Sequence, residues 1–295
     1  MKEHKAGFVN IIGNPNVGKS TLMNALVGER LSIITSKAQT TRHRILGIVN
    51  GDDFQIVFSD TPGIIKPAYG LQESMMDFVR LALVDADVLL YMVEVGEKGL
   101  KDEAFAEKIR SSQIPVLLLI NKIDTSDQGQ LEEQVAFWTE QFPNAEIIPI
   151  SALERFGVPE VLDRILALLP EAPPYFPKDQ LTDRPERFFV NEIIREKILL
   201  HYKKEIPYAV EIETERFEET DEIIRIGAVI MVERATQKGI LIGHKGSALK
   251  RVGTEARKDL ETFFDKKVFL ELFVKVNKNW RNDARQLRRF GYDSK

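Results

Sequence analysis

The chain has 295 residues, a length that favours about two domains with a sizeable core. It contains no cysteine, which excludes disulfide bonds, thiolate metal sites and cysteine nucleophiles and is typical of a reducing compartment. The net charge of −4 is unevenly distributed, because residues 234–295 carry 16 basic and 7 acidic side chains. This excess of positive charge suits a polyanionic partner, with nucleic acid as the first candidate; a solvated charged surface is the alternative.

The start and the apolar runs of the chain predict where the protein works. The first predicted strand begins by Gly7, which leaves no room for a cleaved signal segment. The longest apolar runs, 88–93 and 114–120, are far shorter than the roughly 20 residues that cross a bilayer. We therefore expect a soluble, cytoplasmic protein with no transmembrane segment.

The first motif, residues 13–20, reads G-N-P-N-V-G-K-S and fits the phosphate-loop pattern G-x-x-x-x-G-K-[ST]. An apolar stretch at 8–12 predicts a strand before it, and 21–26 has the spacing of an amphipathic helix. A strand that turns through glycines into a helix directs backbone N–H groups at one point, which suits a polyphosphate. We expect Lys19 to reach the terminal phosphates and Ser20 to ligate Mg²⁺; a glycine-rich turn that matches by chance is the alternative. The expected nucleotide contacts are Gly13, Asn14, Pro15, Asn16, Val17, Gly18, Lys19, Ser20 and Thr21.

A polar segment at 32–44 shows neither helical nor strand periodicity, so we expect a mobile loop. Its threonines are candidates to ligate Mg²⁺ from the side opposite Ser20 while a terminal phosphate is present. His43 in this loop is expected to be a surface residue.

The next strand, 54–58, leads into D-T-P-G. An aspartate at a strand's carboxyl end beside a phosphate loop is suited to hold Mg²⁺, and a glycine N–H can approach a γ-phosphate closely. Turns favour these residues anyway, so it is the distance from the phosphate loop that makes the motif informative. The expected contacts are Asp60, Thr61, Pro62 and Gly63.

Apolar runs at 88–93 and 116–120, with a helical stretch at 102–110 between them, predict parallel strands covered on both faces. This alternation indicates an α/β fold with a doubly wound, mostly parallel sheet that binds ligands at the carboxyl ends of its strands.

The run N-K-I-D at 121–124 predicts which nucleotide base the site selects. The Asp124 carboxylate offers two acceptors and no donor, which matches the N1–H and N2 amine of guanine and not adenine. We expect Lys122 to cover the base face and Asn121 to tie this loop to the phosphate loop. The backbone of Ser151, Ala152 and Leu153 is expected to meet guanine O6.

These motifs together resemble the translation-factor-like GTPases, and G-N-P-N-V-G-K-S with K-A-Q-T-T-R narrows the resemblance to the Era family. The resemblance implies GTP hydrolysis and a switch Mg²⁺ ligand at Thr41, so the expected metal ligands are Ser20, Thr41 and Asp60. D-T-P-G-I followed by Pro67, Leu71 and Met75 is similar to the second switch of the family.

One residue departs from the Ras pattern, because Ile64 stands where a glutamine orients the attacking water. Asn16 is a candidate to hold a K⁺ ion against the phosphates, as related GTPases with this loop do; a role in stabilising the turn is the alternative. The expected catalytic residues are Lys19, Thr41, Gly63 and Asn16.

Four prolines lie within residues 170–177 and predict a semi-rigid linker; a proline-rich ligand is the alternative. Beyond it an α-β-β-α-α-β order surrounds G-H-K-G at 243–246, which is the form of a type II KH loop that clamps single-stranded RNA. A plain helix–helix turn would also explain the glycines. The expected boundaries are 1–170 for a G domain, 171–186 for the linker, 187–277 for a KH domain and 278–295 for a basic C-terminal helix or tail. The expected RNA contacts are Ile242, Gly243, His244, Lys245, Gly246, Ser247, Lys250, Arg281 and Arg288.

The basic C-terminal segment also resembles the Era family, so the likeness spans the whole chain. It implies binding to the 3′ end of 16S ribosomal RNA, a role in maturation of the 30S subunit, a peripheral contact with the inner membrane, and a monomer. An adaptor that binds another protein or a membrane surface is a second hypothesis, and a metabolic phosphoryl-transfer enzyme is a third with no visible second-substrate pocket.

Overall fold

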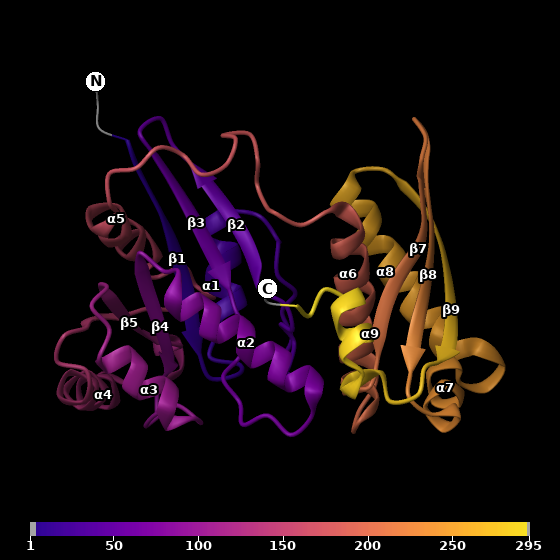
Figure 1. Cartoon of the computed structure of the whole chain (residues 1–295), viewed down its shortest axis with the longest axis horizontal. Coiled ribbons are helices and arrows are strands. Elements are labelled where there is room, and N and C mark those ends of the chain that lie inside the picture. The colour runs from indigo at the N-terminus through magenta and orange to yellow at the C-terminus, as the bar shows by residue number, and fades with distance from the viewer. Residues whose placement is uncertain (1–3, 294–295) are drawn as a thin grey trace. The chain divides into compact units, whose positions relative to one another are not determined.

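The computed structural model of the chain describes residues 4–293. Contacts between Cα atoms divide these residues into two compact units, both visible in Figure 1. The first unit comprises residues 4–68 and 72–183, and the second comprises residues 69–71 and 184–293. The main division therefore lies inside the segment 171–186.

The first unit is built on one mixed sheet. In sheet order its strands are β2 (Ile45–Asn50), β3 (Phe54–Asp60), β1 (Lys5–Gly13), β4 (Val88–Glu94), β5 (Val116–Asn121) and β6 (Glu146–Pro149). Among these described strands only β2, at the edge, runs antiparallel to its neighbour. The predicted α/β fold with a mostly parallel sheet is confirmed, whereas strand β2 was not predicted from the sequence.

Helices alternate with these strands along the chain. They are α1 (Lys19–Val27), α2 (Gly70–Val84), α3 (Glu103–Arg110), η1 (Ile123–Thr125), α4 (Gln128–Gln141) and α5 (Val158–Leu168). The central strands are apolar because helices cover them: Leu89 and Leu90 of β4 and Leu118 and Leu119 of β5 are fully buried. Parallel strands end at one edge, so the loops after β1, β3, β5 and β6 are brought together there.

Residues 171–183 belong to the first unit and are held against its sheet. The side chain of Gln55, fully buried in β3, accepts hydrogen bonds from the N–H groups of Tyr175 and Phe176 at 2.7 and 2.9 Å. Thr182 forms a β-bridge with Gly47 of the edge strand. This part of the predicted linker is therefore ordered by hydrogen bonds to the sheet.

The second unit has the predicted α-β-β-α-α-β order. Its elements are α6 (Glu186–His201), η2 (Ile206–Tyr208), β7 (Glu211–Glu219), β8 (Ile223–Val232), α7 (Ala235–Ile242), η3 (His244–Gly246), α8 (Ser247–Phe264), β9 (Lys267–Val276), η4 (Trp280–Asn282) and α9 (Ala284–Arg289). The sheet order is β7-β8-β9, with β7 antiparallel and β9 parallel to β8. Figure 1 shows α6 and α8 side by side against this sheet, as their contacts require.

Helix α8 shows why this packing follows from the sequence. Val252, Ala256 and Leu260 are four residues apart and fully buried, so they form the single apolar stripe that faces the sheet. The C-terminal segment forms two short helical pieces, η4 and α9, and not the single basic helix that was expected. No helix within residues 4–293 is both long and apolar enough to span a membrane.

Candidate functional site

The phosphate loop links β1 to α1 through two glycines with positive φ. Gly13 has φ +156° and Gly18 has φ +104°. A Cβ atom would lie 2.2 Å from the Met92 carbonyl oxygen at the first position and 2.3 Å from the Asn121 amide nitrogen at the second. Glycine is therefore required at both positions by backbone conformation and by space.

Lys19 lies at the start of α1 with 6% of its surface exposed. Its ammonium donates to the carbonyl oxygens of Gly13 at 3.2 Å and Asn14 at 2.8 Å. Burial lowers the pKa of Lys19 to about 8, although the carboxylates of Asp60 and Glu97 act in the opposite direction. The ammonium is thus held inside the loop at the place where a polyphosphate would meet it.

This lowered pKa predicts a pH dependence of nucleotide binding. Because the pKa of Lys19 lies below the ordinary 10.5, its ammonium penalises folding below about pH 8, and the penalty disappears as the pH rises through 10.5. Phosphates require the ammonium, so binding above pH 8 must take up a proton. We expect GTP affinity to fall about tenfold between about pH 7 and about pH 9. Calorimetry in two buffers would count the proton, with guanosine, which lacks the phosphates, as the control ligand; no uptake would contradict the prediction.

Three oxygen-bearing side chains converge beside Lys19. Ser20 Oγ lies 2.9 Å from Thr41 Oγ1 and donates to Asp60 Oδ2 at 2.7 Å, and Thr41 Oγ1 donates to the same carboxylate oxygen at 3.3 Å. The other oxygen of Asp60, Oδ1, is buried and makes no hydrogen bond among the described residues. Burial raises the pKa of Asp60, and Lys19, Ser20, Ser32 and Thr41 oppose that rise.

This donor set fits Mg²⁺. Hydroxyl and carboxylate oxygens are the ligands that Mg²⁺ prefers, and it commonly takes few of them from protein. An unpartnered buried carboxylate oxygen beside two hydroxyls is what such an ion would satisfy. No cluster of three His, Asp or Glu side chains suited to a metal occurs in residues 4–293, which leaves this set as the strongest candidate.

The predicted base-binding loops meet at the far end of the same site. Asn121 Nδ2 donates to the Val17 carbonyl oxygen at 2.7 Å, which ties this loop to the phosphate loop as expected. Ser151 Oγ donates to Asp124 Oδ1 at 2.6 Å and so fixes the carboxylate. The Ala152 N–H, expected to meet guanine O6, donates instead to Asn121 Oδ1 at 2.9 Å, so a base would have to share it.

A cavity of about 530 Å³ runs between these groups. Its lining includes Pro15, Gly18, Lys19, Ser20, Thr41, Gly63, Asn121, Lys122, Asp124 and Leu153. A nucleotide-sized space therefore joins the phosphate loop, the Mg²⁺ candidates and the base loop. Gly63 closes one wall tightly, since a Cβ atom there would lie 2.6 Å from Pro15 Cα.

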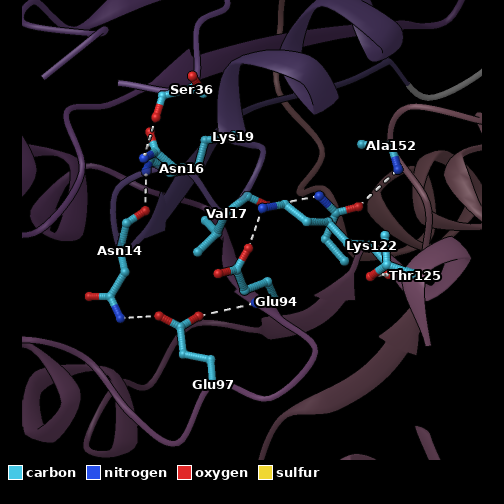
Figure 2. A network of polar contacts seen from close by, with 11 residues as sticks. Asn14, Asn16, Val17, Lys19, Ser36, Glu94, Glu97, Lys122, Thr125 and Ala152 are labelled. Carbon is cyan, nitrogen blue, oxygen red and sulfur yellow. Dashed lines mark hydrogen bonds and ion pairs between the residues drawn. The ribbon is translucent and has the colours of Figure 1, made fainter. Parts of the chain in front are cut away.

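Sequence reasoning missed a set of contacts around the loop after β4. Asn14 Nδ2 donates to the Glu97 carboxylate and to the Gly99 carbonyl oxygen, and the Lys122 ammonium pairs with Glu94 (Figure 2). The Glu94 N–H in turn donates to Glu97. The Lys122–Glu94 and Asn14–Glu97 partners lie 28 and 83 residues apart, so no local pattern indicated them.

Two residues near the site, His43 and Ile64, have buried side chains. The prediction that His43 lies on the surface is wrong: its side chain is buried, with its ring 6.2 Å from that of Phe78 in α2. Ile64 is fully buried and its N–H donates to the Gly13 carbonyl oxygen at 3.0 Å. A hydrocarbon side chain has no group with which to orient water, so the substitute for the glutamine has to be sought elsewhere in the site.

The second unit places the G-H-K-G turn between α7 and α8. Gly243 has φ +70° and Gly246 has φ +78°, and no atom lies within 4 Å of a Cβ built at Gly246. The side chains of His244 and Lys245 are exposed. This backbone is thus open to a close approach, with a cationic side chain at the tip.

A groove of about 360 Å³ begins at this turn and follows α8 and β9. Its lining is Gly246, Leu249, Lys250, Gly253, Thr254, Arg257, Leu270 and Leu272. The lining combines cations and small residues with apolar side chains, which suits a sugar–phosphate chain with its bases.

Other expected RNA residues differ in their surroundings. Ser247 and Lys250 are partly or fully exposed, whereas Ile242 packs against the core of the unit. Arg281 pairs with Glu233 and is only 22% exposed, so its charge is already neutralised within the protein. Arg288 remains exposed.

Comparison with known proteins identifies both units. The family model for 50S ribosome-binding GTPases matches residues 8–122, and the KH domain model matches residues 205–281. GTPase Era of Staphylococcus haemolyticus (strain JCSC1435) is 46% identical over 294 residues, covering 99% of this chain and 98% of its own length.

The chain belongs to the Era GTPase family. Two Era crystal structures agree with its fold, each at 39% identity and a TM-score of 0.93, covering 98% of this chain and 99% of the other. One is Era with MgGDPNP and nucleotides 1506–1542 of 16S ribosomal RNA, and the other is a point variant of Aquifex aeolicus Era with GDP·AlF4⁻. The predicted resemblance and the GTPase activity are therefore confirmed, and the second unit contains a KH domain.

Proposed function

We propose that this Era-family GTPase binds the 3′ end of 16S ribosomal RNA through its KH domain and acts as a switch in maturation of the 30S subunit. The observation that supports this most is the open G-H-K-G turn at the head of a groove lined by Lys250 and Arg257. The Era relative whose crystal structure contains nucleotides 1506–1542 of that RNA is similar over 98% of this chain.

The geometry of the site supports the proposed roles of the nucleotide-binding residues. The backbone of residues 13–20 and the Lys19 ammonium hold the phosphates, and Ser20, Thr41 and Asp60 hold Mg²⁺ directly or through water. When bound, Mg²⁺ neutralises negative charge on the phosphate oxygens and orients them. We also assign to Gly63 an N–H contact with the terminal phosphate, because Gly63 lines the cavity and carries no side chain that would keep a ligand away from its backbone.

Guanine is recognised by the Asp124 carboxylate, which Ser151 holds in place. The Lys122 stem lies along the cavity and covers the base. The contacts of Asn121 to Val17 and Ala152 keep the phosphate and base loops at a constant separation. A nucleoside triphosphate of one length and one base therefore suits the site.

An RNA titration tests the proposed function. With the chain loaded with a non-hydrolysable GTP analogue, we expect saturable binding to an RNA that carries the 3′-terminal sequence of 16S ribosomal RNA. A scrambled RNA of the same length should bind at least about 1,000-fold more weakly, within the range that separates specific from non-specific complexes. Equal affinity for the two RNAs would contradict the RNA assignment. It would not contradict the assignment of GTP hydrolysis, which does not rest on RNA binding.

A bound K⁺ ion is the proposed substitute for the missing glutamine. Asn16 has φ +68° in the phosphate loop, and its Nδ2 donates to the Ser36 carbonyl oxygen at 2.9 Å. Because Nδ2 is engaged, Oδ1 is the atom available to ligate a cation. A monovalent charge there would offset the charge that develops on the phosphates during hydrolysis.

We expect kcat for GTP to rise at least about tenfold when K⁺ replaces Na⁺, because a cation placed at this point is worth more than that in related enzymes. Asn16→Ala should remove the response while GDP affinity stays within about twofold, since nucleotide binding rests mainly on the loop backbone. Stopped-time phosphate assays in matched chloride salts measure both. A hydrolysis rate that does not depend on K⁺ would contradict this proposal and would indicate that RNA or a protein partner accelerates GTP hydrolysis.

The remaining assignments are a cytoplasmic location, a monomer and a peripheral contact with the inner membrane. The first is compatible with the finding that no helix in residues 4–293 could span a membrane. Sedimentation at several protein concentrations tests the monomer, and co-sedimentation with anionic vesicles tests the membrane contact. A concentration-dependent mass, or no binding to vesicles, would remove the respective assignment.

A further inference from the structure

A buried arginine lies at the end of the segment that carries Thr41. Arg44 is the last residue before β2, and its side chain is 9% exposed. Its two terminal nitrogens bind both carboxylate oxygens of Asp85, at 2.6 and 3.0 Å. Such a two-point pair fixes the orientation of the guanidinium as well as its position.

The same guanidinium reaches two central strands. Arg44 Nε donates to Ser59 Oγ in β3 at 2.6 Å, and Nη2 donates to Asn10 Oδ1 in β1 at 3.2 Å. Asn10 Nδ2 donates to the Ala82 carbonyl oxygen at 2.6 Å and to Asp85 at 2.7 Å. The network therefore joins β1, β3 and the end of α2 through one guanidinium that is buried, although the Asp85 side chain that it pairs with is 36% exposed.

Each partner of Arg44 lies next to a part of the nucleotide site. Ser59 directly precedes Asp60, and Asn10 lies three residues before Gly13. Asp85 directly follows α2, the helix after the second switch. Neither Ser59, Asn10 nor Asp85 lines the cavity, so these contacts are not nucleotide contacts.

Thr41 stands three residues before Arg44, which limits their separation to about 11 Å of extended chain. The two residues between them are also held, because Arg42 is fully buried and His43 packs against Phe78 of α2. Fixing Arg44 therefore restricts where the Thr41 hydroxyl can lie.

We propose that Arg44 and Asp85 are positioning residues for the Mg²⁺-bound state, because their pair holds Thr41 beside Ser20 and Asp60. The inference rests on the proposed role of Thr41 as a metal ligand. The pair also joins the end of the first switch segment to the end of α2, so the two segments hold each other in place. A GDP complex has no terminal phosphate to engage Thr41, so its affinity does not depend on the pair.

The test uses Arg44→Lys, which keeps the charge and loses the planar fork, and Asp85→Asn, which keeps the shape and loses the charge. For both, we expect the Mg²⁺ concentration for half-maximal binding of a GTP analogue to rise about tenfold, the size of coupling found within such networks. The rate of tryptic cleavage after Lys37 in the loaded form should rise with it. GDP affinity should stay within about twofold of wild type.

Two comparisons separate positioning from simple support of the fold. The double variant should need no more Mg²⁺ for half-maximal binding than the more impaired of the two single variants, because the two residues act as one unit. Arg164→Gln breaks another two-point arginine pair of the same unit, with Glu146, and should change none of these quantities. If GTP-analogue and GDP affinities instead fall together with the melting temperature, the pair serves the fold alone and the inference is wrong.

Thr41→Ala separates the ligand role of Thr41 from the positioning role of the pair. If it leaves the Mg²⁺ requirement unchanged, the proposed ligand role of Thr41 fails. If it raises the requirement while the Arg44 and Asp85 variants do not, the ligand role stands and the positioning inference fails.

Discussion

Asp124→Asn should convert the GTP preference of this protein into a preference for xanthine nucleotides. The carboxylate accepts from both guanine N1–H and the N2 amine, whereas an asparagine side chain presents one acceptor and one donor. Two hydrogen bonds to a charged acceptor contribute about 1.5–3 kcal/mol each, so GTP affinity should fall at least about 100-fold. Xanthine carries an oxygen in place of the amine and so pairs with the asparagine donor.

Competition of GTP, XTP and ATP against a fluorescent guanine nucleotide would measure this change. Asp127→Asn is the matched control, because Asp127 accepts from the Gln130 N–H at the start of α4 and lies outside the cavity. Asparagine caps a helix about as well as aspartate, so that variant should keep the GTP preference. An unchanged preference for GTP over XTP in Asp124→Asn would contradict the assignment of guanine recognition to Asp124.

Replacing both His244 and Lys245 by aspartate should abolish RNA binding. Both side chains are exposed on the turn beside Gly246, where the backbone leaves open space. Like charges brought against a polyanion cost several kcal/mol, so the expected loss is more than about 100-fold. The slope of log affinity against log salt should also flatten by about 0.7 for each single-strand phosphate that the protein no longer neutralises.

The control for that experiment changes charge elsewhere in the KH unit. Lys203 and Lys204 follow α6 and are exposed, so Lys203→Asp with Lys204→Asp alters the net charge at least as much. Filter binding of the 16S 3′-terminal RNA should disappear in the first double variant and be largely retained in the second. Similar reductions in both would indicate unspecific attraction, and an unaffected first variant would contradict the KH assignment. Nucleotide affinity reports whether each variant is folded.

The elements that were predictable from sequence are those that local chemistry specifies. The apolar runs of β4 and β5 indicated buried parallel strands because their neighbours on both faces are apolar. The helix predicted to follow the G-H-K-G turn is α8, because its apolar stripe repeats every four residues. The edge strand β2 was missed, since it is short and lies after a segment without periodicity.

Sequence alone specifies the chemistry at the strand ends and at the RNA turn: the phosphate loop, the D-T-P-G turn, the N-K-I-D run and the G-H-K-G turn. Each is a short motif whose function depends on adjacent backbone and side chains. The folded structure determines which charges are paired. Arg281 is paired with Glu233, Lys122 with Glu94, and Arg44 with Asp85. These partners are 28 to 48 residues apart, and only the folded sheets and helices bring them within hydrogen-bonding distance.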